Sequence, residues 1–353
     1  MLRPPPTIGA RTALSLVIVA AITVFACGRP PGAGVEAAGG APLDLEGDHG
    51  QYLRSVEGAR LELVDPGTDG AWREIRGAGR VVRLAASPER IASRTLATDE
   101  ILLEIAEPER IVLLSPFAGD PQFSASADKA QRLGNVGGFS TEEILAASPD
   151  LVFAAGFNTQ ETLAQLEAAG VPVVVLLDHE SLAAIERNIR TVGFAIGRDR
   201  EAARLVGSMR QRLEEARARV GSRADGLRVV HWSGGVVLGG RTVFDDALSY
   251  LGAVNLAAEN GLEGWPRISA EQVVVWDPDV IFTDSYVAGD VVPAALDGTR
   301  AATLGNLESL DGRDMAAISH HVASMVERLA DALVRASERI EAAGARNPVT
   351  APE

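Results

Sequence analysis

Two neighbouring histidines, His320 and His321, are the side chains of this chain best suited to hold a metal. Neutral histidine is the commonest metal ligand in proteins. Both follow an apolar segment, residues 315–319, that we interpret as a strand, so they would lie on the loop at its carboxyl end. An ordinary surface pair is the alternative, because adjacent side chains rarely share one metal.

Aromatic side chains follow two other predicted strands. Residues 227–231 end at His231 and are followed by Trp232, and residues 280–283 are followed a little later by Tyr286. We interpret His231 as a core histidine, and Trp232 and Tyr286 as candidate ligand contacts on the loops.

Two acidic residues, Glu142 and Glu271, occupy equivalent places in a repeated segment. Residues 140–153 recur 129 residues later as residues 269–282, with Ser, Glu, Pro, Asp and Phe identical at the same offset. The serine that opens each copy is a helix N-cap signal, completed by Glu or Gln three residues on. Each glutamate thus stands at the second helical position, where its charge near the helix dipole contributes ~0.3–1 kcal/mol even without another role.

A repeat at this spacing predicts two similar lobes, because solenoid repeats have periods of up to about 50 residues. Each copy continues through Pro-Asp into a β-branched apolar run, which is typical of a strand buried on both faces of a parallel sheet. A cleft between two lobes is a preferred place for a ligand site.

The elements that position these residues alternate between strand and helix. A hairpin is expected over residues 59–83, and residues 199–220 lack proline and predict a helix of roughly 30 Å. Further strands are expected at 111–114, 151–155 and 173–177, and helices at 245–251 and 324–343. The predicted fold class is α/β, with two doubly wound parallel-sheet lobes joined by a single long interlobe helix. The expected divisions are a signal peptide (1–26), a lipidated cysteine and tether (27–58), an N-terminal lobe (59–195), the interlobe helix (196–222), a C-terminal lobe (223–345) and a tail (346–353).

Length and charge narrow the function classes. The chain has 353 residues, more than the ~250–300 at which single cores usually divide, and a formal net charge of −15. No basic stripe with interleaved aromatic residues is present, so a nucleic-acid partner is not expected. We expect a monomer.

The N-terminus has the pattern of an export signal. Arg3 and Arg11 precede an apolar run, residues 12–25, that is short for a membrane span. Cys27 follows and is the only cysteine, so no disulfide can form within the chain. Val-Phe-Ala-Cys at 24–27 resembles a bacterial lipobox, which implies a lipid on Cys27 and a membrane anchor. Cleavage with an incidental cysteine is the alternative. The protein is expected in the periplasm or on the cell surface.

The order of these features resembles the substrate-binding proteins of bacterial ABC importers for iron–siderophores, heme and cobalamin, over about residues 60–343. The resemblance is carried by Ser-Pro-Glu-Arg-Ile at 87–91, Gly-Asn-Val-Gly-Gly at 134–138, the Pro-Asp segments at 147–150 and 276–279, and residues 188–198. It implies that Glu142 and Glu271 dock on arginines of a membrane permease whose ATPase is a separate chain. It also implies an iron or cobalt chelate as the ligand, and no intrinsic cofactor.

The resemblance adds candidates for the ligand site. Trp265, in Gly-Trp-Pro, is similar to a cleft tryptophan of the cobalamin-binding members, where it would stack on a flat or bulky chelate. Phe117 falls where aromatic cleft residues are expected, although residues 117–121 depart from the tyrosine-and-proline pattern common there. His320 or His321 could coordinate heme iron or cobalt.

No enzyme motif is present: the chain lacks a P-loop, a G-x-S-x-G elbow and H-E-x-x-H. We therefore predict a binding protein. A receptor for bare zinc or manganese is one alternative, but it needs three or four convergent ligands. His49 lies in the tether and His179 follows a first-lobe strand, which leaves His231, His320 and His321. An envelope enzyme or sensor that reuses the fold is a more distant alternative.

Overall fold

The computed structural model describes residues 62–64, 72–77, 80–138, 140–155, 160–176, 178–284 and 294–344. The predictions for the signal peptide, Cys27, the tether with His49, Tyr286 and the tail at 346–353 lie outside these residues. None of the described helices is both long enough and apolar enough to cross a membrane.

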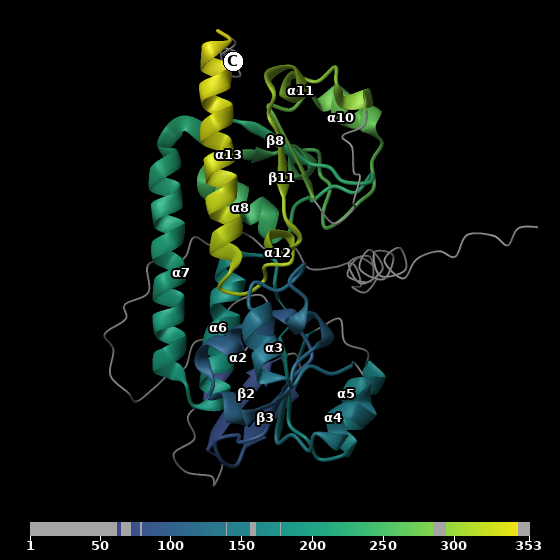
Figure 1. Cartoon of the computed structure of the whole chain (residues 1–353), viewed down its shortest axis with the longest axis vertical. Coiled ribbons are helices and arrows are strands. Elements are labelled where there is room, and N and C mark those ends of the chain that lie inside the picture. Colours follow the sequence, from purple (N-terminus) through teal and green to yellow (C-terminus); the bar gives the residue numbers. More distant parts are fainter. Residues whose placement is uncertain are drawn as a thin grey trace, which may run out of the picture. The chain divides into compact units, whose positions relative to one another are not determined.

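The chain divides into two compact units (Figure 1). The N-terminal unit comprises the described residues up to Arg212 together with Ala316–Ala323, and the C-terminal unit comprises Leu213–Met315 and the described residues from Ser324 onward. The division between Arg212 and Leu213 falls within one long helix, α7 (Asp199–Val220). The predicted fold class, with two α/β lobes joined by a single long helix, is confirmed.

A four-stranded parallel sheet forms the core of the N-terminal unit. Its order is β5 (Ile111–Leu113), β4 (Ile91–Ser93), β6 (Leu151–Ala155) and β7 (Val173–Leu176). All five residues of β6 are buried, as the apolar run predicts for a strand covered on both faces. The helices of this unit are α2 (Leu96–Ile105), α3 (Ala127–Leu133), α4 (Thr141–Ala146), α5 (Gln160–Ala168) and α6 (Leu182–Ile196).

A small antiparallel sheet also belongs to this unit and precedes the parallel sheet in the chain. It consists of β1 (Glu62–Val64), β2 (Arg73–Gly77) and β3 (Arg80–Leu84), paired in that order. The predicted hairpin is therefore present, and a third strand extends it.

The sheet of the C-terminal unit has the same topology. Its order is β9 (Val254–Asn255), β8 (Arg228–His231), β10 (Val280–Asp284) and β11 (Leu307–Leu310), all parallel. In both sheets, therefore, the strand that comes second in the chain lies at one edge, followed by the first, the third and the fourth. The helices here are α8 (Val243–Leu251), α9 (Leu256–Glu259), α10 (Ala270–Trp276), α11 (Arg300–Leu304), α12 (Gly312–Met315) and α13 (Val322–Ala342). The repeated sequence forms the helix before the third strand in each sheet, α4 and α10.

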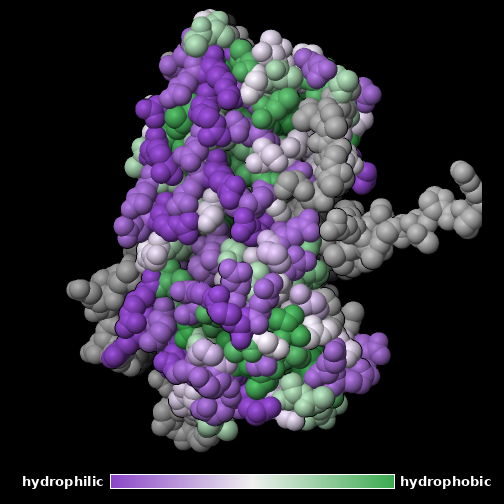
Figure 2. All heavy atoms as spheres, viewed as in Figure 1, coloured by the Kyte–Doolittle hydropathy of each residue, from purple (hydrophilic) through white to green (hydrophobic). Residues whose placement is uncertain are grey.

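Helix α7 follows its predicted bounds and buries one face. Its buried residues recur at helical spacing along one stripe, at Ala202, Val206, Met209, Leu213, Ala216 and Val220. Arg219 pairs with Asp331 of α13 at 3.1 Å. The side of these two helices visible in Figure 2 is mostly hydrophilic.

The strand predicted at residues 315–319 is wrong. Residues 312–315 form α12 instead, and the fourth strand is β11. Among the described strands, β11 pairs with β10 alone, at the edge of the sheet, and it reads Leu-Glu-Ser-Leu. This edge strand lacks a continuous apolar run, and therefore gives a weak sequence signal.

Candidate functional site

The loops after the parallel strands are the first place to look for a ligand site, because ligands of open α/β sheets bind at the carboxyl ends of the strands. In the N-terminal unit, Phe117 lies on the turn after β5, Pro116–Gly119. The half-buried ring of Phe117 packs edge-on against Phe123, with ring centroids 5.6 Å apart. A surface cavity of about 610 Å³ opens beside this turn. Its lining is Pro116, Gly119, Asp120, Pro121, Gln131, Gly134 and Val136.

Trp265 lies next to the loop that follows β8 in the C-terminal unit. The backbones of its two neighbours bond to that loop: Gly239 N donates to Gly264 O at 2.9 Å, and Val237 N donates to Pro266 O at 3.0 Å. A Cβ at Gly239 would lie 2.2 Å from a backbone oxygen, so only glycine permits this approach. The structure thus brings the half-buried Trp265 to the carboxyl end of β8.

Trp232 and His231, at the end of β8, are both buried. Trp232 is 8% exposed and belongs to a hydrophobic cluster that includes Val273 and Ile281. Its indole N–H has no hydrogen-bond partner among the described atoms. His231 is 2% exposed, as expected for a core histidine, and its Nε2 lies 3.5 Å from Asp284 Oδ2.

His320 and His321 pack inside the N-terminal unit, on the segment Ala316–Ala323. His321 Nε2 lies 3.0 Å from the hydroxyl of Ser126, the residue before α3. The two imidazole centroids are 4.0 Å apart. Burial lowers the pKa of His320 to about 3 and that of His321 to about 4. Both rings are therefore neutral at pH 7, and within the described structure His320 Nδ1 has no hydrogen-bond partner.

A buried carboxylate on α2 holds the same segment. Glu100 is 2% exposed, and its Oε2 accepts a hydrogen bond from Ser319 Oγ at 2.5 Å. Its Oε1 accepts from Ala125 N at 2.9 Å and Ser124 Oγ at 3.2 Å. Burial raises the pKa of Glu100 to about 7, against the opposing effect of these hydrogen bonds. The neighbouring Asp99 is fully buried, which raises its pKa to about 6. Nothing in the sequence pattern pointed to this acid pair.

The described residues contain no group of three or more His, Cys, Asp or Glu that could hold a metal ion. The bare-metal alternative therefore gains no support from this part of the chain. His179, the other described histidine, is 6% exposed, and burial lowers its pKa to about 4.

The repeated helices present their glutamates as predicted. Ser140 caps α4 by accepting a hydrogen bond from Glu143 N at 3.1 Å, and Ser269 caps α10 by accepting from Gln272 N at 3.4 Å. Glu142 and Glu271 are exposed at the second position of their helices. The Ser269 hydroxyl bonds to Glu271 and lowers the pKa of that carboxyl, which is therefore ionised at neutral pH.

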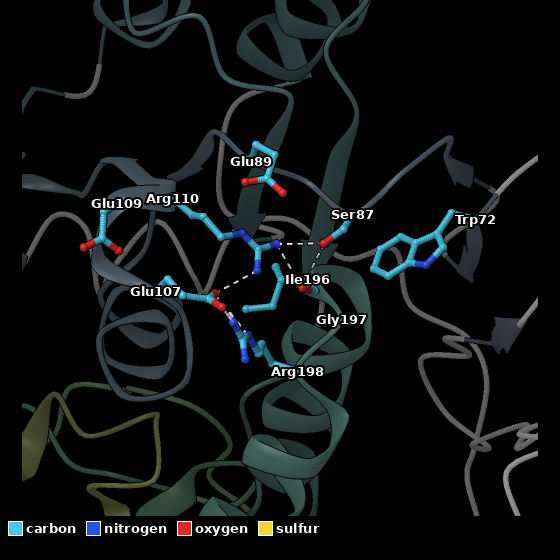
Figure 3. Close-up of a pocket in the computed structure, with 9 residues that line it drawn as sticks. All are labelled: Trp72, Ser87, Glu89, Glu107, Glu109, Arg110, Ile196, Gly197 and Arg198. Atoms are coloured by element: carbon cyan, nitrogen blue, oxygen red, sulfur yellow. Dashed lines mark hydrogen bonds and ion pairs between the residues drawn. The ribbon is translucent and has the colours of Figure 1, made fainter.

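A second cavity, lined mostly by polar side chains, lies near the amino ends of the strands of the N-terminal sheet (Figure 3). This cavity, of about 480 Å³, lies where the chain enters β4 and β5. Arg110 donates to Ser87 Oγ at 3.1 Å, to Ile196 O at 3.0 Å and to Glu107 Oε2 at 2.9 Å. Arg198 also pairs with Glu107, through Nε at 3.0 Å. These contacts fix the turn between α6 and α7 to the sheet, so we interpret the cluster as structural.

Residues 91–302 match the periplasmic binding protein family, and the chain belongs to that family. It is 25% identical to the cobalamin-binding protein of Halobacterium salinarum over 266 residues, which cover 72% of this chain and 70% of that protein. It is 28% identical to the vitamin B12-binding protein of Yersinia pestis over 201 residues, covering 56% of this chain and 70% of that protein.

Solved structures show the same architecture. The periplasmic heme-binding protein RhuT from Roseiflexus sp. RS-1, in apo form, superposes with a TM-score of 0.61 at 25% identity, over 70% of this chain and 99% of that chain. The vitamin B12-binding protein BtuF of Vibrio cholerae shares the fold at 22% identity with a TM-score of 0.61, over 71% of this chain and 99% of that chain. The family and these neighbours are binding proteins, which confirms the prediction that the chain is not an enzyme.

Proposed function

We propose that this chain is the receptor component of an ABC importer that captures a heme- or cobalamin-type metal chelate and delivers it to a membrane permease. The observation that carries the docking role is the duplicated helix: each unit exposes one glutamate, Glu142 or Glu271, at the same position of the same element. The ligand class follows from the relatives, which are named for cobalamin, vitamin B12 or heme.

We assign ligand contacts to residues beside the carboxyl-end loops and to His320, which follows α12. Trp265 and Phe117, each half-buried beside such a loop, supply flat apolar faces suited to a macrocycle. His320 is the better metal ligand of the histidine pair, because its Nδ1 has no hydrogen-bond partner within the described structure, whereas His321 bonds to Ser126. Trp232 would contribute its buried N–H at the end of β8. Tyr286 remains a candidate from the sequence, and ferric siderophores remain within the ligand class.

The two glutamates would dock on basic residues of the permease. Exposed charges of this kind guide association and set the register of a complex more than they add affinity. A lipid on Cys27 would keep the receptor at the membrane that holds its permease, in the periplasm or at the cell surface.

A visible absorption spectrum tests the ligand class. The domain lacking residues 1–27 would be mixed with hemin, cyanocobalamin or a ferric siderophore and then desalted. We expect one chromophore to remain bound at one equivalent. If none remains, and zinc instead binds in equilibrium dialysis, the bare-metal alternative replaces the chelate.

Uptake tests the docking role separately. The double variant Glu142→Ala with Glu271→Ala should abolish uptake of the chelate, while the Kd of the receptor for the chelate stays unchanged. A matched control replaces two other exposed helix glutamates, Glu161 and Glu338, with alanine and should leave uptake intact. Normal uptake by the first double variant would refute docking through these acids.

A further inference from the structure

Each repeated helix ends in the same unusual backbone conformation. Ser148, after α4, has φ of 48°, and Asp277, after α10, has φ of 46°. The two residues are equivalent in the repeat, and each precedes the repeated proline. Residues other than glycine rarely adopt the left-handed region, and they persist there only when their surroundings fix them.

An arginine at the start of the first strand contributes to that fixation, together with backbone hydrogen bonds from Ser148 N and Asp277 N to their own helices. Arg90, directly before β4, donates from Nε to Ser148 O at 2.8 Å and from Nη2 to Ala147 O at 2.5 Å. Arg228, the first residue of β8, donates from Nη1 to Asp277 O at 3.3 Å. A cation at the carboxyl end of a helix also interacts favourably with the helix dipole.

The aspartate after the proline joins the helix end to the same strand. Asp150 accepts hydrogen bonds from Glu89 N at 2.8 Å and Arg90 N at 2.9 Å, and its own N donates to Arg90 O at 2.8 Å. Asp279 repeats the pattern, since it accepts from Arg228 N at 3.0 Å and its N donates to Arg228 O at 2.8 Å. Arg90, Ser148 and Asp150 together form what we call the N-terminal clamp.

The two copies differ in how much else supports them. In the C-terminal unit, Asp279 is buried and pairs with Arg300 Nη1 at 2.7 Å, while Asp277 Oδ1 accepts from Arg300 N at 2.7 Å. In the N-terminal clamp, Arg90 and Asp150 are both exposed. The hold on α4 therefore depends more on Arg90 than the hold on α10 depends on Arg228.

Helix α4 needs such a hold. It has six residues and buries one side chain, Ile144, and a helix this short is not stable by itself. Glu142 lies only five residues before Ala147, whose carbonyl Arg90 binds. The direction of α4, and with it the position of the Glu142 carboxylate, is thus set by the packing of Ile144 and the partly buried Leu145 and by the clamp.

Given the docking role proposed above for Glu142, we infer that Arg90 is a positioning residue for permease docking. It acts through the Ser148 and Ala147 carbonyls, without contacting the permease. Loss of its guanidinium removes two of the hydrogen bonds that hold this segment, and leaves the bond from Ser148 N to Leu145 O at 2.9 Å. Glycine at position 148 adopts that region without a Cβ clash, so Ser148→Gly should compensate for the loss.

The experiment measures binding of the full-length receptor to its cognate permease–ATPase complex in lipid nanodiscs. Arg90→Ala should raise the Kd for the nanodisc complex about tenfold. It should leave hemin and cyanocobalamin titrations and the urea midpoint unchanged, and it should increase hydrogen exchange in α4. Arg90→Ala with Ser148→Gly should return the nanodisc Kd to near the wild-type value. Arg223→Ala is the matched control, because Arg223 also donates to a helix-end carbonyl, Arg219 O at 2.8 Å, but not on a docking helix.

The outcomes separate this inference from the proposed function. If Glu142→Ala with Glu271→Ala binds nanodiscs like wild type, the docking role fails. If those acids matter but Arg90→Ala binds normally, docking stands and the positioning role of Arg90 is refuted. A defect in Arg90→Ala that Ser148→Gly does not rescue, or that appears equally as a lower urea midpoint, also refutes it.

Discussion

The buried carboxyl of Glu100 makes the stability of this protein depend on pH in a way that can be isolated. Its pKa rises from the ordinary value of 4.5 to about 7, mainly through burial, with Asp99 adding a smaller repulsion. Between these two pH values the folded protein keeps a proton that the unfolded chain releases. The free energy of unfolding therefore falls as pH rises through this window.

The size of the effect follows from the two pKa values. A rise from 4.5 to about 7 corresponds to about 3 kcal/mol, at about 1.4 kcal/mol for each pH unit. Glu100→Gln cannot ionise, and its amide can still accept from Ala125 N and donate to Ser319 Oγ. When the pH is raised from 5 to 8, we expect the free energy of unfolding of Glu100→Gln to increase by about 2–3 kcal/mol relative to that of wild type.

Urea unfolding followed by circular dichroism at pH 5, 6, 7 and 8 measures this difference. The comparison between variants is necessary because the buried histidines act in the opposite direction. Burial lowers the pKa values of His320 and His321, so their contribution to stability is lost as pH falls below about 6.5. This loss is common to both proteins and cancels. Glu338→Gln, at an exposed carboxyl, is the control and should show no such trend. A stability difference between Glu100→Gln and wild type that is constant across this range would refute the reasoning.

Four other substitutions have definite expectations. Trp265→Ala should weaken cyanocobalamin or hemin binding about tenfold in calorimetry, through loss of stacking area, and an unchanged Kd would remove this residue from the site. His320→Ala should abolish the Soret shift of added hemin, whereas an unaltered spectrum would show that the iron ligand lies elsewhere. Arg110→Leu should lower the free energy of unfolding by about 3 kcal/mol, because it leaves several buried acceptors without donors, and a loss below about 1 kcal/mol in urea titration would contradict this account. Ser269→Ala should lower the free energy of unfolding by about 1 kcal/mol, because it removes the N-cap of α10. Hydrogen exchange in α10 should become faster, and unchanged exchange would argue against the cap.

The elements that the sequence predicts well are those with strong local signals. Strand β6 is a continuous apolar run and α7 has an uninterrupted helical pattern, and both were predicted with their observed bounds. The N-caps at Ser140 and Ser269 were also predicted, because side-chain chemistry and spacing determine a cap locally.

Contacts between distant parts of the chain could not be predicted in this way. Ser319 bonds to Glu100 across 219 positions, so no local pattern reveals that the segment Ala316–Ala323 packs on α2. The clamp was missed for a related reason. Ser148 and Asp277 share the repeat offset, but Arg90 and Arg228 do not, because the chain between each arginine and its helix differs in length.

The return of Ala316–Ala323 to the N-terminal unit has a consequence for synthesis. The chain emerges from the ribosome in order, so Glu100 is made long before Ser319, its partner across 219 positions. Until the last tenth of the chain is available, the N-terminal unit lacks Ser319, which donates a hydrogen bond to the buried Glu100. The N-terminal unit can therefore complete its contacts only after nearly the whole chain has been made.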